Sequence, residues 1–227
     1  MDFATRVVVV TGASGQLGRA VVDEVRSRGA RVALLGRSPV SAPEGSRAWT
    51  LDPASLTDAQ RVFGEVAAHF GRIDALANVA GGFRWQTLDS SDDLSEWDEM
   101  LQANLRSCVV ACKAALPHLK NAGAGRIVNV GSTGAVRGTN GMGAYAASKA
   151  GVMRFTEALA DELKLSGITV NAVLPSIIDT PANRADMPDA NHALWVKPEE
   201  IARVVAFLMS DAASAVTGAL VPVTGRT

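Results

Sequence analysis

Short runs of apolar residues alternate with amphipathic stretches along almost the whole chain. The apolar runs are rich in Val, Ile and Leu, which is typical of strands buried on both faces. They predict strands at residues 6–10, 31–35, 48–51, 73–79, 125–130, 168–174 and 219–223.

The stretches between these runs repeat apolar residues at helical spacing and predict helices at residues 16–28, 55–70, 94–104, 105–121, 143–166 and 198–209. Strands and helices that alternate in this way form a parallel sheet with helices on both faces. We therefore predict an α/β fold: a single domain over residues 1–227, built on a Rossmann-type, doubly wound sheet of about seven strands. The irregular residues 176–197 predict a substrate lid, because a loop of that length in a compact domain is usually functional.

Composition narrows the class of protein. Hydrophobic residues make up 48% of the chain, charged residues 20%, and the net charge is −1. This balance is typical of a soluble globular protein and gives no basic patch for nucleic acid or a membrane surface. No apolar run spans a bilayer, and the N-terminus enters a strand almost at once, so we expect a cytoplasmic protein without a signal peptide.

The cysteines and histidines do not predict a metal site. Cys108 and Cys112 share one face of a helix and are expected to be buried thiols. The histidines have no ligand spacing; they are His69, His118 and His192.

Tyr145 and Lys149 are the most informative pair in the chain. Residues four apart share a helix face, so the lysine is placed beside the tyrosine. A nearby ammonium group is expected to lower the pKa of a phenol. Ser132, upstream, supplies a hydroxyl that can hold a substrate atom in front of it. Together these groups suit proton transfer coupled to hydride transfer.

A glycine-rich turn follows the first strand and opens the first helix, where backbone amides bind a pyrophosphate. Its candidate cofactor-binding residues are Gly12, Ser14, Gly15, Gln16, Leu17 and Gly18. No acidic residue ends the second strand; Arg37 and Ser38 stand there and favour the 2′-phosphate of NADPH over NADH. Asp52 ends the third strand, where a carboxylate can accept from the adenine amino group. After the fourth strand, Asn78, Ala80 and Gly81 are expected beside the adenosine ribose.

These motifs together resemble the short-chain dehydrogenase/reductase family over nearly the whole chain. The resemblance implies that Tyr145 donates the proton, Lys149 assists it and binds the nicotinamide ribose, and Ser132 orients the carbonyl. It implies that Asn104 anchors a water that relays protons to Lys149. It also implies a segment that meets the nicotinamide carboxamide, formed by Pro175, Ile178 and Thr180.

Two positions depart from the family pattern. The middle glycine of compact members usually stands where this chain has Gln16, and here Gly15 lies one place earlier. Ser176 stands where a glycine commonly follows Pro175. Several segments are also similar to the quinonoid dihydropteridine reductase subgroup, although that subgroup is NADH-linked and lacks the catalytic serine.

The substrate pocket is expected to have apolar walls, with aromatic rings placed to stack on a flat ring such as a pterin or quinone. The candidate walls are Phe83, Trp85, Met142, Met187 and Trp195. Arg84, Arg137 and Arg184 are candidate contacts for an anionic substrate. The leading hypothesis is an NADPH-dependent reductase of small carbonyl compounds. The alternatives are a dihydropteridine-type reductase and a non-catalytic nucleotide-sensing protein on the same fold.

Self-association is a further expectation. Residues 105–121 and 143–166 are apolar around most of each helix, whereas a surface helix of a monomer has a polar face. The family resemblance implies that these two helices pair across a two-fold axis. We expect a homodimer, or a homotetramer if the last strand also pairs.

Overall fold

A computed structural model describes residues 3–90 and 92–227; residues 1, 2 and 91 of the predicted domain lie outside the described residues. Within the described chain, seven strands form one sheet, with every neighbouring pair parallel and the order β3-β2-β1-β4-β5-β6-β7. This confirms the predicted Rossmann-like α/β sheet. The strands are β1 (Val7–Thr11), β2 (Arg31–Gly36), β3 (Ser46–Thr50), β4 (Ala75–Asn78), β5 (Arg126–Val130), β6 (Thr169–Pro175) and β7 (Leu220–Val223).

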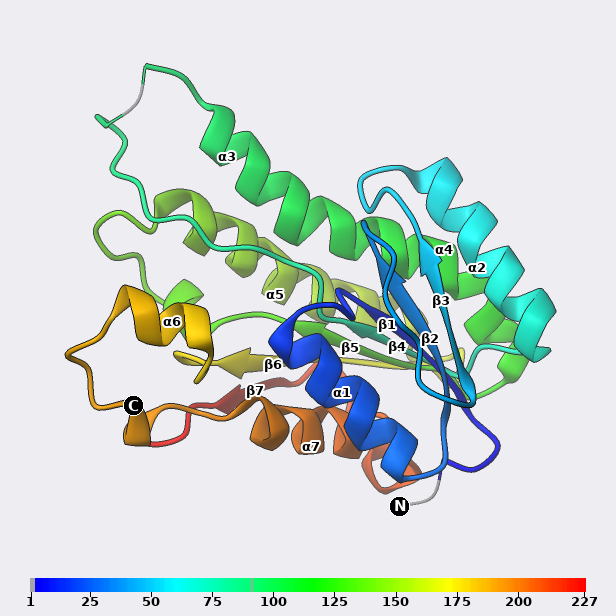
Figure 1. Cartoon of the computed structure of the whole chain (residues 1–227). Helices are drawn as coiled ribbons and strands as arrows, with labels where there is room; N and C mark the ends of the chain where they lie inside the picture. Colours follow the sequence, from blue (N-terminus) through cyan, green and yellow to red (C-terminus); the bar gives the residue numbers. More distant parts are fainter. Residues whose placement is uncertain (1–2, 91) are drawn as a thin grey trace.

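Apolar side chains on both faces of the sheet build two cores. In β1, Val7 and Val9 join one core and Val8 and Val10 join the other, because successive side chains of a strand point to opposite faces. Figure 1 shows helices on both sides of the sheet. The first core is covered by α2 (Leu56–Phe70), α4 (Ser107–Ala122) and α5 (Gly143–Leu163), and the second by α1 (Gln16–Ser27) and α7 (Pro198–Leu208).

The predicted break between residues 94–104 and 105–121 is wrong, because the chain stays helical there. The helix α3 (Ser95–Met100) continues into a π-helical turn, Leu101–Arg106, and then directly into α4. Figure 1 shows this run as one long helix. The extra residue in a π turn shifts the register of the helix faces, and such turns occur frequently at functional sites. Here the turn contains the buried Asn104.

The predicted irregular lid contains a short helix, α6 (Pro181–Asp186), and a 3₁₀ turn at His192–Leu194. The helix begins where the Thr180 hydroxyl accepts from the Asn183 amide and Pro181 occupies the first turn. This cap and proline form a usual helix start, which the sequence analysis missed. The two ends of the lid meet where the Asp179 amide donates to the Val196 carbonyl at 2.8 Å.

The parallel sheet brings distant segments together at its carboxyl edge. Strand β1 lies between β2 and β4, so successive connections leave the sheet in opposite directions at this point. Such a switch point is the usual ligand crevice of a doubly wound sheet. Among the described residues, no helix is both long and apolar enough to cross a membrane.

Phe63 tests the first core. Its side chain is fully buried among α2, α4 and the sheet, so Phe63→Ala is expected to lower the free energy of unfolding by about 3–5 kcal/mol. The matched control, Leu165→Ala, removes a side chain that is 95% exposed and is expected to change it by about 0.5 kcal/mol or less. Urea denaturation of both variants measures the difference, and equal losses would contradict this packing.

Candidate active site

A cavity of about 1520 Å³ runs along the carboxyl edge of the sheet. Its walls come from the turns after β1, β2, β4, β5 and β6, from α5, and from the lid. Most of the candidate residues line it: Gly12, Ser14, Gly15, Gln16, Leu17, Gly18, Arg37, Ser38, Ala80, Gly81, Phe83, Trp85, Ser132, Met142, Tyr145, Lys149, Pro175, Ile178, Thr180 and Met187. Asp52, Asn78, Asn104 and Trp195 are not on its wall.

Backbone packing fixes the glycine-rich turn at one end of the cavity. Gly12 has a φ of 65°, and a Cβ there would lie 2.7 Å from the Ala80 backbone. A Cβ on Gly18 would lie 2.1 Å from the Gly12 carbonyl oxygen, whereas one on Gly15 would meet that oxygen at an ordinary 3.5 Å. The two glycines that the turn requires are therefore Gly12 and Gly18. The position of Gly15 does not disturb the turn.

The first turn of α1 is open to an anion. Its N-cap, Gly15, gives no side-chain hydrogen bond, and the turn has no acidic residue. The first amides of a helix lack intrahelical partners, and the helix dipole favours a negative charge there. Arg37 and Ser38 directly follow β2, the strand that pairs with β1, and both line the cavity.

Tyr145, Lys149 and Ser132 meet on one wall of the cavity. The first two project from the start of α5, and Ser132 follows β5. The Lys149 ammonium group donates to the Val130 carbonyl at 2.8 Å, and the Gly134 amide donates to the Ser132 hydroxyl at 3.1 Å. The geometry thus gathers an acid, a cation and a hydroxyl donor.

Burial dominates the electrostatics of this wall. Burial raises the pKa of Tyr145 above its ordinary value, and the hydrogen bond with Ser132 partly opposes this. Burial lowers the pKa of Lys149 to about 8, with a smaller opposing effect from Cys108. The expected lowering of the tyrosine pKa is therefore wrong for the unliganded protein. Burial outweighs it, and the ammonium group is directed to the Val130 carbonyl.

Asn104 is buried behind the cavity wall that contains Tyr145 and Lys149. Its amide nitrogen donates to the Gly82 carbonyl at 3.1 Å and to the Ser148 hydroxyl at 3.0 Å, and its oxygen accepts from the Gly82 amide at 2.9 Å. Its side chain therefore clamps the loop after β4 to α5. The backbone carbonyl of Asn104 lies in the π turn and accepts from the Ser107 hydroxyl at 3.5 Å.

Ser148 is a residue of this site that the sequence analysis missed. It is fully buried, accepts from Asn104 and donates to the Tyr145 carbonyl at 2.8 Å. The sequence offered one signal for this residue: a serine directly before Lys149, in a helix whose first residues are mostly glycine and alanine.

Asn78 lies below the cavity. Its amide donates to the Asn129 oxygen at 2.9 Å and to the Cys112 sulfur at 3.2 Å. It therefore faces the sheet interior, which corrects its expected place beside a ribose. Cys108 and Cys112 are buried free thiols, as predicted, and their mutual hydrogen bond and burial raise the pKa of Cys112.

Asp52 and Trp195 are not among the lining residues, although Leu51 and Pro53, on either side of Asp52, line the cavity. One Asp52 oxygen accepts from the Ala54 amide at 2.9 Å, in the turn before α2. The Trp195 ring is 5% exposed and packs on His192, with ring centroids 4.4 Å apart. Trp195 supports the lid from inside and does not form a pocket wall.

Aromatic side chains flank Tyr145. The Phe83 ring stands edge-on to the Tyr145 ring, with centroids 4.9 Å apart. The Trp85 indole lies over Gly141 and donates to the Asn140 carbonyl at 3.1 Å. These contacts join the loop after β4 to the loop before α5.

The arginines expected to meet an anionic substrate do not line the cavity. Arg84 and Arg184 form ion pairs with Glu99 and Asp179, at 3.3 Å and 2.5 Å. Arg137 is likewise absent from the lining residues.

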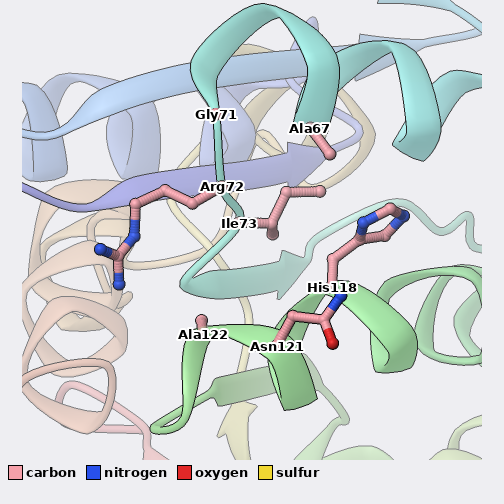
Figure 2. Close-up of a pocket in the computed structure, with 7 residues that line it drawn as sticks. All are labelled: Ala67, Gly71, Arg72, Ile73, His118, Asn121 and Ala122. Carbon is pink, nitrogen blue, oxygen red and sulfur yellow. The ribbon is translucent and has the colours of Figure 1, made fainter.

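A smaller cavity of about 360 Å³ lies near the opposite, amino edge of the sheet (Figure 2). It is formed by the ends of α2 and α4 and the residues just before β4. Figure 2 shows the Arg72 side chain directed away from His118, and Arg72 pairs with Asp74. The described residues contain no cluster with metal-ligand composition, here or elsewhere.

Known proteins with similar sequences and structures belong to one enzyme family. Residues 6–191 match a family model described as short chain dehydrogenase. The chain is 34% identical to the 3-oxoacyl-[acyl-carrier-protein] reductase FabG of Escherichia coli (strain K12), over 99% of this chain and 98% of that protein. It is 33% identical to the levodione reductase of Leifsonia aquatica, over 98% and 94% respectively.

Among solved structures, a short-chain type dehydrogenase/reductase from Mycobacterium ulcerans superposes with a TM-score of 0.91 at 27% identity, over 99% of this chain and 90% of that one. The curated relatives named here are reductases of oxo compounds. The expected closer likeness to quinonoid dihydropteridine reductase is therefore not supported.

Tyr145 is the single tyrosine of the chain, so its ionisation can be followed directly. Because burial raises its pKa, phenolate absorbance of the unliganded protein is expected to appear at a pH above the ordinary midpoint of 10. Ser132→Ala is expected to move the midpoint higher still, since the hydrogen bond that favours phenolate is lost. Tyr145→Phe provides the blank. A midpoint below 10 in the unliganded protein would show that the ammonium group outweighs burial.

Proposed function

We propose that this chain, which belongs to the short-chain dehydrogenase/reductase family, is an NADPH-dependent oxidoreductase that reduces the carbonyl group of a small substrate. The observation that carries the proposal is the meeting of Tyr145, Lys149 and Ser132 on one wall of the large cavity. A nucleotide-sensing protein needs none of these three groups, so their convergence disfavours that alternative. The serine and the comparisons together disfavour a dihydropteridine-type reductase.

The glycine turn fits the pyrophosphate of a dinucleotide. Gly12 and Gly18 leave no space for a Cβ because the turn packs against the Ala80 backbone and against itself. This packing fixes the first turn of α1 at the end of the cavity, where a helix N-terminus suits a phosphate. The uncapped amides of α1 offer donors to its oxygens. When bound, the reduced cofactor supplies the hydride.

The side chains of this chain handle the proton. Because burial raises the pKa of Tyr145, the phenol keeps its proton at neutral pH and can donate it to a carbonyl oxygen. The Ser132 hydroxyl orients and polarises that carbonyl. Lys149, with a pKa of about 8, is mostly cationic at neutral pH and stabilises the phenolate left behind. Lys149 would also hold the nicotinamide ribose of the bound cofactor.

NADPH is favoured over NADH by the chemistry after β2. Arg37 offers a cation for the 2′-phosphate and Ser38 a hydroxyl, and both line the cavity. An acidic residue at this position would bind the ribose 2′-hydroxyl instead, and none is present.

The pocket walls favour a compact, apolar carbonyl compound. Half of the Phe83 surface stays exposed beside Tyr145 and is available to a substrate ring. Met142 and Met187 add flexible apolar surface. Residues 1–227 form one domain in this proposal, and residues 176–197 form its lid.

Assembly is part of the proposal. The outer surfaces of α4 and α5 expose apolar and small side chains, including Val109 at 37% exposure, Ala147 and Ala158. A helix surface of this kind is suited to burial against a second copy of the chain. We propose a homodimer through these helices, or a homotetramer if β7, the last strand of the sheet, also pairs.

Tyr145→Phe tests the chemistry. The variant keeps the ring and its contact with Phe83 but lacks the proton, so kcat/KM for carbonyl reduction is expected to fall by about 10²–10⁴-fold. NADPH binding, followed by fluorescence, should change little. Near-normal turnover by this variant would remove Tyr145 from the mechanism.

Arg37→Ala tests cofactor choice. Loss of a charge-assisted contact with the 2′-phosphate is expected to lower kcat/KM for NADPH by roughly 10–100-fold and to leave that for NADH nearly unchanged. Steady-state kinetics with both cofactors and one ketone measure the ratio. Equal losses with both cofactors would contradict phosphate recognition by Arg37.

A further inference from the structure

Ser176 links the end of β6 to the last residues of the chain. Its hydroxyl donates to the Thr224 carbonyl at 2.8 Å and accepts from the Thr227 hydroxyl at 2.7 Å. Ser176 and Thr227 both line the large cavity. The Thr227 hydroxyl also lies 3.0 Å from the Thr224 carbonyl, so the two hydroxyls and this carbonyl form one hydrogen-bonded cluster.

The turn formed by residues 224–227 is wedged against the far end of the lid. Gly225 has a φ of 64°, and a Cβ there would lie 2.8 Å from the Leu194 carbonyl oxygen and 3.0 Å from the Val196 nitrogen. The Arg226 amide donates to the same Leu194 carbonyl at 2.9 Å. Only a glycine allows this turn and this approach together.

The same turn therefore contacts both ends of the lid. Residues 176–179 leave β6 at one end, and residues 194–196 return at the other. The two ends are joined where the Val196 amide donates to the Ile177 carbonyl at 3.3 Å and the Asp179 amide donates to the Val196 carbonyl at 2.8 Å. The lid segment between these two ends contains α6. Thr180, Asn183 and Met187 of this segment line the cavity.

We propose that Ser176 and the turn at residues 224–227 form a hydroxyl-bridged clamp that holds the lid over the cofactor. In this proposal Ser176 and Thr227 are positioning residues, which act through Ile178, Thr180 and the lid helix. The effect on cofactor binding rests on the NADPH site proposed above.

Two pairs of variants test the clamp. Thr227→Val removes the hydroxyl at nearly constant shape, whereas Thr227→Ser keeps it. Ser176→Ala removes the bridging hydroxyl. Ser210→Ala is the matched control, because the Ser210 hydroxyl also donates to a backbone carbonyl, that of Phe207 at 2.7 Å, but outside the cavity and the lid. Thr227→Val keeps the test open if Ser176→Ala does not fold.

Hydrogen exchange without nucleotide is the first readout. Loss of one net hydrogen bond is expected to speed exchange across residues 178–196 by about fivefold in Ser176→Ala and Thr227→Val. Thr227→Ser should restore the protection, and Ser210→Ala should leave the lid unchanged. Lid exchange equal in Thr227→Val and Ser210→Ala would overturn the clamp.

NADPH affinity is the second readout. The dissociation constant is expected to rise by about fivefold in the two clamp variants and not in Ser210→Ala. Faster lid exchange with unchanged NADPH affinity would overturn the positioning role. If the wild-type protein fails to bind NADPH, the proposed function fails, while hydrogen exchange still decides whether the clamp exists.

Discussion

The close approach of the first turn to the fourth strand is the constraint on which the rest of the structure depends. Gly12 passes so near Ala80 that a Cβ would lie 2.7 Å from its backbone. Gly18 brings the start of α1 against Gly12, where a Cβ would lie 2.1 Å from the carbonyl oxygen. Parallel pairing of β1 with β4 brings these backbones together at the point where the connections diverge. Because all seven strands of the described sheet are parallel, every other functional segment then ends at the same edge.

The site is built in two layers at that edge. The outer layer meets the cavity and contains Tyr145, Ser132 and Lys149. The inner layer contains buried amides and hydroxyls, of which Asn104 is the centre: it binds both backbone groups of Gly82 and the Ser148 hydroxyl. A buried amide in this position is stabilising only because its partners are satisfied. The π turn contains Asn104, so a local irregularity of the helix lies where the loop after β4 is joined to α5.

Burial is opposed by a hydrogen bond at Tyr145 and by a neighbouring charge at Lys149. The apolar surroundings raise the pKa of Tyr145 and lower that of Lys149, so both groups are held closer to their neutral forms than in water. A phenol that keeps its proton is suited to act as an acid in carbonyl reduction, and a lysine near its pKa responds readily to a neighbouring charge. The same desolvation that defines the pocket therefore tunes its chemistry.

The sequence by itself determined what contiguous residues encode. The unbroken run of valines at residues 7–10 predicted a buried parallel strand, and the glycine-rich turn between that strand and the first helix predicted a nucleotide-binding turn. The separation of Tyr145 and Lys149 predicted a shared helix face. Only the tertiary structure decided the partners of side chains that are distant along the chain. Asn104 meets Ser148 across 44 positions and Thr227 meets Ser176 across 51, while Asn78 and Trp195 are buried away from the cavity. The physical reason is that periodicity and turn geometry are local properties, whereas hydrogen-bond partners and desolvation depend on how strands and helices dock.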